Sequence, residues 1–168
     1  KPLLEIQNLD VTLKNRDSYF KALDDLSFNV FPGEILGLVG ESGAGKSMTG
    51  SAILGLIEPP LFISKGKIIF KGKRIEENAI SVRGSMISMI FQDPLVSLNP
   101  LRKIGDQLVE TIRTHINIDK AEAITYAKNL LEEVGIDRER FNAYPHTFSG
   151  GMRQRVVIAL ALAPNPSL

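Results

Sequence analysis

The sequence predicts an α/β fold, with a core of strands and helices, an antiparallel β subdomain at its N-terminal side and an inserted helical lobe. Three patterns predict this arrangement. An apolar run at residues 35–39 leads into a glycine-rich loop and then a helix, which is typical of a buried central strand. Before that run, apolar and polar residues alternate as in half-buried strands. Beyond Leu101, apolar residues recur at helical spacing instead.

The composition excludes several classes of protein. Hydrophobic residues make up 43% and charged residues 23% of the chain, as in a globular domain. The net charge of +1 argues against nucleic-acid binding, which needs a concentrated basic excess. The absence of cysteine excludes disulfides and thiolate metal sites. No apolar run approaches the roughly 20 residues that cross a bilayer, so any membrane role would come through a partner.

Five segments are expected to form strands. Alternation predicts strands at residues 3–13 and 27–30, and an edge strand at residues 67–70 before a glycine turn. The runs 35–39 and 86–91 are apolar at successive positions, which predicts strands buried on both faces. These two runs would form the centre of the core.

Helices are expected after the glycine-rich loop and throughout the second half of the chain. Residues 46–57 precede a proline pair, which cannot continue a helix. In the region 101–135 the apolar residues fall at helical spacing, and Asp119 with Glu122 forms a capping-box pattern. A last helix is expected to begin near Ser149, whose hydroxyl can cap it, and to end before the prolines that follow Ala163.

A phosphate cradle is predicted at residues 40–47, which match the P-loop pattern G-x-x-x-x-G-K-[ST]. Loop N–H groups and the positive end of the following helix can converge on phosphates. Lys46 would reach the β- and γ-phosphates, and the Ser47 hydroxyl would ligate Mg²⁺. A glycine-rich turn without a ligand is the alternative, which the flanking strand and helix patterns disfavour. The candidate nucleotide-binding residues are Gly40, Glu41, Ser42, Gly43, Ala44, Gly45, Lys46, Ser47 and Met48.

A P-loop alone is compatible with kinases, GTPases, helicases and transporters, but a second segment narrows the choice. Residues Ser149, Gly150 and Gly151 open the last predicted helix and are followed by a Gln154-Arg155 pair. This segment resembles the signature motif of ABC ATPases, which usually reads LSGGQ. In that family it closes over the γ-phosphate held by the P-loop of an opposing subunit. The resemblance therefore implies ATP bound between two head-to-tail domains; a simple helix cap is the alternative.

A third element is Gln92, which follows the predicted strand 86–91 and matches the Q-loop glutamine of the ABC family. In the family this residue contacts Mg²⁺ and the attacking water, and it links the core to the helical lobe. The resemblance makes Lys46 and Gln92 the catalytic candidates, with Ser47 and Gln92 as the metal-binding candidates. A glutamine after a strand is otherwise most often solvated.

Two longer stretches, residues 89–100 and 144–156, resemble the ATPases of bacterial oligopeptide, dipeptide and nickel importers. Met152 replaces the usual glutamine of the signature motif, as is common in this branch. The resemblance implies a P-loop NTPase core, RecA-like and incomplete, with an N-terminal antiparallel β subdomain and an inserted helical lobe. The expected bounds within the truncated nucleotide-binding domain 1–168 are 1–92 for the β subdomain and P-loop core, 93–148 for the helical lobe, and 149–168 for the signature helix and the start of the return to the core.

The resemblance also implies partners and a location. The expected partners are a second ABC ATPase subunit, identical or related, and transmembrane permease subunits that act with a substrate-binding protein. The expected location is peripheral, on the cytoplasmic face of the bacterial inner membrane. One alternative is a soluble ABC ATPase acting on nucleic acid or the ribosome, although such proteins usually carry long or basic insertions. A P-loop kinase is another, but it would not need residues 149–151.

Two features differ from the family pattern. In the family, the strand after a segment like residues 163–168 supplies an Asp for Mg²⁺ and a Glu that polarises the attacking water. Residues 1–168 end before such a strand. We therefore expect that the full-length protein hydrolyses ATP and that residues 1–168 alone do not. The family also places an aromatic ring near the position of Leu13 to stack on adenine. Either Tyr19 or Phe20 is expected to substitute, or both pack on a strand.

Overall fold

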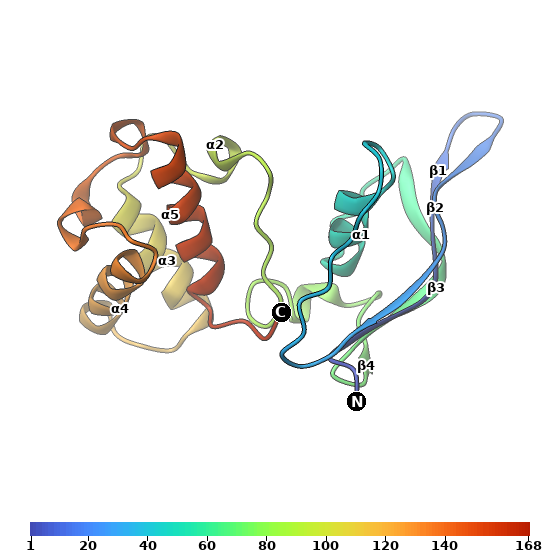
Figure 1. The fold of residues 1–168 in the computed structure, drawn as a ribbon, viewed down its shortest axis with the longest axis horizontal. Helices are drawn as coiled ribbons and strands as arrows, with labels where there is room; N and C mark the ends of the chain where they lie inside the picture. Colours follow the sequence, from blue (N-terminus) through green and yellow to red (C-terminus); the bar gives the residue numbers. More distant parts are fainter. The chain divides into compact units, whose positions relative to one another are not determined.

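The computed structural model describes residues 1–168, apart from the side chains of Pro94 and Leu95. The chain divides into two compact units, Lys1–Val82 and Arg83–Leu168 (Figure 1). Among the described residues, none of the helices has the length and apolar character needed to cross a bilayer. The first unit holds the P-loop, whereas the second holds both Gln92 and the signature segment.

The first unit contains a four-stranded antiparallel sheet in the order β2-β1-β3-β4. The expected strands 3–13, 27–30 and 67–70 are confirmed, the last two as parts of longer strands. The segment expected at the sheet edge is not the outermost strand, because β4 pairs with it. The strand bounds are β1 Leu4–Lys14, β2 Tyr19–Val30, β3 Leu61–Phe70 and β4 Lys73–Arg74.

The sheet is irregular where β1 passes β3. Asn8 has a positive φ of 48°, and the pairing with β3 shifts between Gln7 and Asp10. Gly66 lies opposite this irregularity with a φ of +105°, and a β-carbon there would lie 2.5 Å from Leu9 Cα. The close approach of the two backbones therefore requires glycine at this position.

Helix α1 (Lys46–Ile53) lies alongside the sheet in Figure 1, and the short η1 (Ala79–Ser81) ends the first unit. Helix α1 begins at Lys46, as predicted. It ends earlier than the predicted Ile57, because Gly55 has a left-handed φ of 62°. A left-handed glycine just after a helix is a common way for the chain to leave it.

The second unit is helical. Its α-helices are α2 (Pro94–Ser97), α3 (Ile104–His115), α4 (Lys120–Glu133) and α5 (Gly150–Leu162), with 3₁₀ turns η2 (Arg138–Asn142) and η3 (Pro145–Thr147). The predicted capping box is confirmed, since Glu122 N donates to Asp119 Oδ1 at 2.8 Å and Asp119 N donates to Glu122 Oε2 at 3.1 Å. Helices α3, α4 and α5 enclose one apolar core (Figure 1), whose most buried members include Ile104, Leu108, Ile112, Leu131 and Val156.

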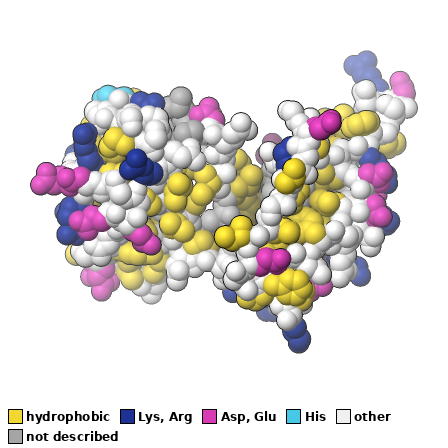
Figure 2. All heavy atoms as spheres, viewed as in Figure 1, with side chains coloured by type: hydrophobic (Ala, Val, Ile, Leu, Met, Phe, Trp, Pro, Cys, Tyr) yellow, Lys and Arg dark blue, Asp and Glu magenta, His cyan; other side chains and the backbone are white. Residues whose placement is uncertain are grey.

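The two predicted central strands do not form, so these two predictions were wrong. Residues 35–39 are irregular, with Ile35 99% and Val39 95% exposed. Residues 86–91 form only a bridge between Ile87 and Arg83, besides hydrogen bonds to the last two residues of the chain. Within the described residues no strand lies beside either run, and a strand without a partner leaves its N–H and C=O groups unpaired. Hydrophobic side chains are accordingly visible on the surface of both units (Figure 2).

Candidate nucleotide-binding site

The glycine-rich loop ends at Gly45, which caps the N-terminus of α1. Gly45 has φ 83° and ψ 6°, and no side chain caps the helix. A β-carbon at Gly45 would lie 2.4 Å from Leu23 Cδ2 of β2. The left-handed backbone favours glycine, and a β-carbon here would also have to displace the end of the Leu23 side chain. The first amides of α1 lack intrahelical acceptors, and the first turn carries no acidic side chain, so this helix end can receive an anion.

Lys46 spans the loop that it follows. Its Nζ donates hydrogen bonds to the carbonyl oxygens of Gly40 at 2.7 Å and Glu41 at 2.6 Å. One turn later, Thr49 is buried, and both its backbone N–H and its hydroxyl bind Gly45 O, at 2.9 and 3.1 Å. Residues of α1 therefore bond both the first and the last residues of the loop, and the Lys46 ammonium lies beside the first two.

The candidate residues of this loop are accessible. Most are exposed, and Gly45, Lys46 and Met48 are partly buried. The Ser47 hydroxyl lies in the first turn of α1 and is exposed. The loop thus presents backbone amides, a lysine and a hydroxyl to solvent, which is the donor set that binds a phosphate chain and its metal ion.

In the second unit, the signature segment forms a similar helix start. Ser149 is the N-cap of α5, and its Oγ accepts a hydrogen bond from Met152 N at 3.3 Å. Gly150 and Gly151 are exposed, and a β-carbon on either would meet nothing within 4 Å. Packing inside this chain does not require glycine at these two positions. Their small size leaves the first amides of α5 open to a ligand.

Gln92 lies in the irregular segment before α2, and it is exposed. Four predicted candidates are thus in the second unit, whereas the P-loop is in the first. They are Gln92, Ser149, Gly150 and Gly151. Each of the three motifs is accessible within its own unit.

Comparison with known proteins identifies the family. Residues 23–168 match the ABC transporter family. The chain belongs to the ABC transporter family. It is 47% identical to the oligopeptide transport ATP-binding protein OppD of Bacillus subtilis, over 99% of this chain and 48% of that protein. It is 43% identical to the dipeptide transport ATP-binding protein DppD of Lactococcus lactis subsp. cremoris, over 99% of this chain and 50% of that protein. The chain spans about half the length of these curated relatives.

Solved structures of ABC proteins support the same family and fold. The fold is similar to that of an ATP-binding cassette in a dimeric post-hydrolysis state bound to ADP and Pi, with a TM-score of 0.84 and 25% identity. This similarity covers 97% of this chain and 70% of that one. The predicted P-loop NTPase fold class is therefore confirmed, although the two central strands are not formed within the described residues.

Two arginines fix the signature helix of this ABC protein within the second unit. Arg153 Nε donates to Pro145 O in η3 at 2.9 Å. Arg155 Nη1 donates to Gly135 O, just after α4, at 3.1 Å. These bonds connect α5 to η3 and to the turn after α4, and so stabilise the position of Ser149.

Sequence reasoning missed Gln107, which fixes the segment after α2. Gln107 is 8% exposed, its Oε1 accepts from Asn99 N at 2.9 Å, and its Nε2 donates to the carbonyl oxygens of Asn99 and Arg102 at 3.0 and 3.1 Å. Leu98, next to Asn99, is buried in the helical core. The signal in the sequence is a polar residue on the apolar face of α3, next to Leu108. Such a residue is buried only if its amide is hydrogen-bonded.

The adenine-stacking candidates Tyr19 and Phe20 begin β2 opposite Lys14 and Leu13. Both aromatic side chains are 67% exposed. Neither ring is therefore committed to the core of the first unit, and both remain available to a ligand.

Proposed function

We propose that the full-length protein binds and hydrolyses ATP and thereby drives the import of peptides, or of nickel, through a bacterial ABC transporter. The P-loop geometry carries this proposal: Gly45 starts α1 with a left-handed backbone and packs against Leu23, and Lys46 Nζ bonds the carbonyl oxygens of Gly40 and Glu41. The named functions of the relatives support the transport role, because they are oligopeptide and dipeptide transport ATP-binding proteins.

We assign the nucleotide contacts to the loop and the first turn of α1. The amides of residues 40–48 bind the phosphate chain, and Lys46 neutralises charge at the β- and γ-phosphates. Ser47 and Gln92 carry the oxygen donors that Mg²⁺ prefers, so they are the residues that would hold this ion. Bound Mg²⁺ supplies neutralisation of the phosphate oxygens. Gln92 also orients the attacking water.

The second part of the ATP site comes from another subunit. Ser149, Gly150 and Gly151 form a helix start whose open amides fit an anion, and a single P-loop site does not need two such cradles. We propose that this segment binds the γ-phosphate held by the P-loop of a second ABC ATPase subunit, identical or related, arranged head-to-tail. The dimeric state named for a similar cassette structure supports this arrangement.

The remaining partners are transmembrane permease subunits, with a substrate-binding protein acting through them. The protein then lies on the cytoplasmic face of the bacterial inner membrane, and the helical lobe of residues 93–148 contacts the permease. A soluble ABC ATPase that acts on nucleic acid or the ribosome is the alternative function. The net charge of +1 disfavours this alternative, because nucleic-acid binding depends on basic residues that neutralise phosphates.

The first experiment is a calorimetric titration of the full-length protein with MgATP, alongside Lys46→Ala. Binding is expected in the wild type and is lost in the variant. Lys73→Ala is the charge-matched control, because Lys73 is exposed on β4 of the same unit and should leave binding unchanged. Wild-type protein that does not bind MgATP, or a Lys46→Ala variant that binds equally well, would contradict the proposed function.

A further inference from the structure

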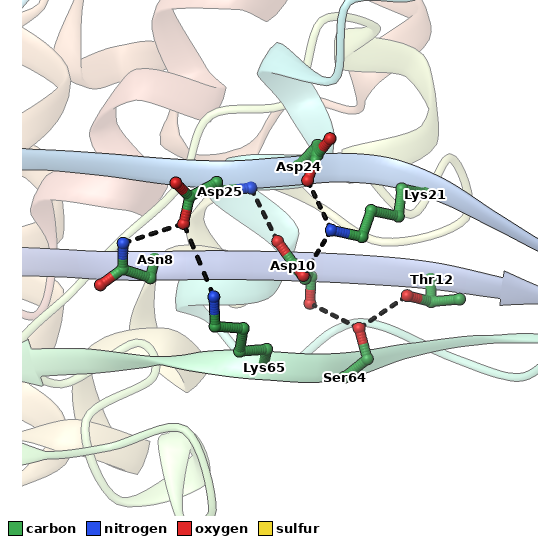
Figure 3. Close-up of polar contacts among 8 residues, drawn as sticks. All are labelled: Asn8, Asp10, Thr12, Lys21, Asp24, Asp25, Ser64 and Lys65. Carbon is green, nitrogen blue, oxygen red and sulfur yellow. Dashed lines mark hydrogen bonds and ion pairs between the residues drawn. The ribbon is translucent and has the colours of Figure 1, made fainter.

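Asp10 is a buried carboxylate in the middle of β1. The residue is 4% exposed, and both of its oxygens are bound from β2 (Figure 3). Oδ1 accepts from Asp25 N at 2.7 Å, and Oδ2 lies 2.9 Å from Lys21 Nζ. Lys21 also contacts Asp24 Oδ1 at 2.6 Å. The carboxylate thus attaches two points of β2, four residues apart, to β1.

The bond to Asp25 has a backbone cause. Pairing runs from Leu9 with Leu26 to Val11 with Leu23, so β2 contains one more residue than β1 between these pairs. Asp25 lies in this bulge, with a left-handed φ of 50°. A bulge leaves an N–H group outside the ladder, and a buried N–H needs an acceptor. Asp10 provides that acceptor.

The anchored segment supports the phosphate loop. Leu23 lies between Lys21 and Asp25, and it is 7% exposed. Its Cδ2 occupies the space that any side chain on Gly45 would need, and the carbonyl oxygen of Ala22 lies 3.3 Å from the same point. Ala22 and Leu23, between the two anchored points of β2, therefore form the surface against which the last glycine of the P-loop packs.

We infer that Asp10 is a positioning residue for the nucleotide site. By capping the bulge and binding Lys21, it holds Leu23 against Gly45 and so fixes the start of α1. Without the carboxylate, β2 can return to a regular register, and a slip of one residue turns its side chains to the other face. Asp10 itself does not contact the nucleotide in this account, which rests on the proposed ATP-binding function.

The same sheet offers a matched control in Glu76. Like Asp10, it has a carboxylate that pairs with a basic side chain, here Arg74, and accepts a backbone hydrogen bond, here from Ile68 N at 3.2 Å. Its side chain is 9% exposed. Glu76 follows β4, at the opposite edge of the sheet from β2. Its hydrogen bonds and its ion pair are with Ile68 and Arg74 and do not involve residues 21–25. Loss of Glu76 therefore weakens the sheet without releasing Leu23.

The experiment compares Asp10→Leu, Asp10→Asn and Glu76→Leu in the full-length protein. The measured quantities are the Kd for MgATP, the Tm, and the hydrogen exchange rate of the Asp25 amide. In Asp10→Leu the Kd should rise about tenfold, as expected when the shell that supports a site is loosened. The rise should be smaller in Asp10→Asn, which keeps an acceptor for the Asp25 N–H. Glu76→Leu should lower the Tm without changing the Kd, and Asp25 exchange should accelerate in Asp10→Leu but not in Glu76→Leu.

Two results would overturn the inference while leaving the proposed function intact. One is wild-type affinity in Asp10→Leu, provided that wild-type binding depends on Lys46. The other is an equal rise of the Kd in Glu76→Leu, which would mean that any loosening of the sheet affects the loop. If Asp10→Leu does not fold, Asp10→Asn carries the test because it loses the ion pair with Lys21, and an unchanged Kd in that variant would overturn the inference. If wild-type protein does not bind MgATP, the proposed function fails and the inference fails with it.

Discussion

Leu23 of β2 packs against Gly45, the glycine that starts α1, so closely that a β-carbon on Gly45 would lie 2.4 Å from Leu23 Cδ2. The P-loop is thus shaped by a contact with a strand more than twenty residues earlier in the chain, as well as by its own glycines. The same contact distinguishes Gly45 from Gly43, which has the same φ.

Gly45→Ala is expected to destabilise the protein more than Gly43→Ala. Both glycines have a φ of 83°, so both substitutions strain the backbone by about 1 kcal/mol or more. Only Gly45→Ala must also displace the buried Leu23 side chain, because a β-carbon at Gly43 meets nothing within 4 Å. Urea unfolding measures the difference in the free energy of unfolding, and titration with MgATP measures affinity. Equal losses for the two variants would show that the Leu23 contact is not significant.

Ser149 is expected to have two separable roles, as a helix cap and as a part of an anion site. Ser149→Ala removes the bond to Met152 N and should lower the free energy of unfolding by about 1 kcal/mol. Ser149→Asp keeps a capping oxygen, so stability should return to near the wild-type value. The added negative charge should nevertheless oppose phosphate binding. The ATPase activity of the full-length Ser149→Asp variant should therefore be well below that of the wild type. Wild-type activity in Ser149→Asp would contradict the anion-binding role.

The contribution of Asp10 to stability should depend on pH. The backbone N–H of Asp25 and the ammonium of Lys21 hold the pKa of Asp10 below its ordinary value. Asp24 and Asp10 raise the pKa of Lys21, so Lys21 stays charged throughout the acidic range. Because the folded pKa of Asp10 is depressed, its stabilisation is present above the unfolded pKa of about 3.9 and is lost as the pH falls through the folded pKa.

Unfolding measurements on wild type and Asp10→Asn between pH 3 and 8 test this dependence. The difference in the free energy of unfolding should be constant above about pH 5 and should shrink below about pH 4. Asp24→Asn is a suitable control, since the Asp24 side chain is 68% exposed and its contact with Lys21 is open to solvent. A difference that does not change with pH would mean that the charge of Asp10 contributes nothing.

Either Tyr19 or Phe20 is expected to stack on the adenine ring, since Leu13 is not aromatic. Both rings are 67% exposed, so Tyr19→Ala and Phe20→Ala should change the free energy of unfolding by less than about 0.5 kcal/mol. One of the two should weaken MgATP binding several-fold and leave affinity for inorganic triphosphate unchanged. Unchanged nucleotide affinity in both variants would contradict the stacking role.

Gln107 is expected to stabilise the second unit. Gln107→Met keeps the length of the side chain but leaves the backbone groups of Asn99 and Arg102 without their partner, at a cost of about 1–3 kcal/mol. Thr111→Val is the matched control, one turn further along α3, because its hydroxyl bonds only to a carbonyl of the same helix. Thermal unfolding should separate the two variants, and similar Tm values would refute the role assigned to Gln107.

The sequence predicts features that depend on neighbouring residues better than features that depend on residues far apart in the chain. The start of α1, the capping box of α4 and the Ser149 cap of α5 were predictable, because each depends on residues within one or two turns. The strands expected at 35–39 and 86–91 were not, because a strand forms only when a neighbour pairs with it, and local hydrophobicity does not show whether one is present.

In the candidate site, too, features set by neighbouring residues were predictable, and features that need distant partners were not. The P-loop and signature motifs were found from their patterns, because the spacing of their glycines and polar groups is local. The residues that support these motifs were missed. Asp10 lies within an alternating strand, and Gln107 lies on an apolar helix face, and their partners become apparent only in three dimensions.

The exposed run at residues 35–39 also bears on self-association of the chain. Ile35 and Val39 are almost fully exposed, and no strand of the described residues pairs with this run. An apolar backbone with free hydrogen-bonding groups is a template for addition of a strand from another molecule. The run also contains no charged or proline residue that would oppose such pairing. A segment that paired with residues 35–39 would remove this template.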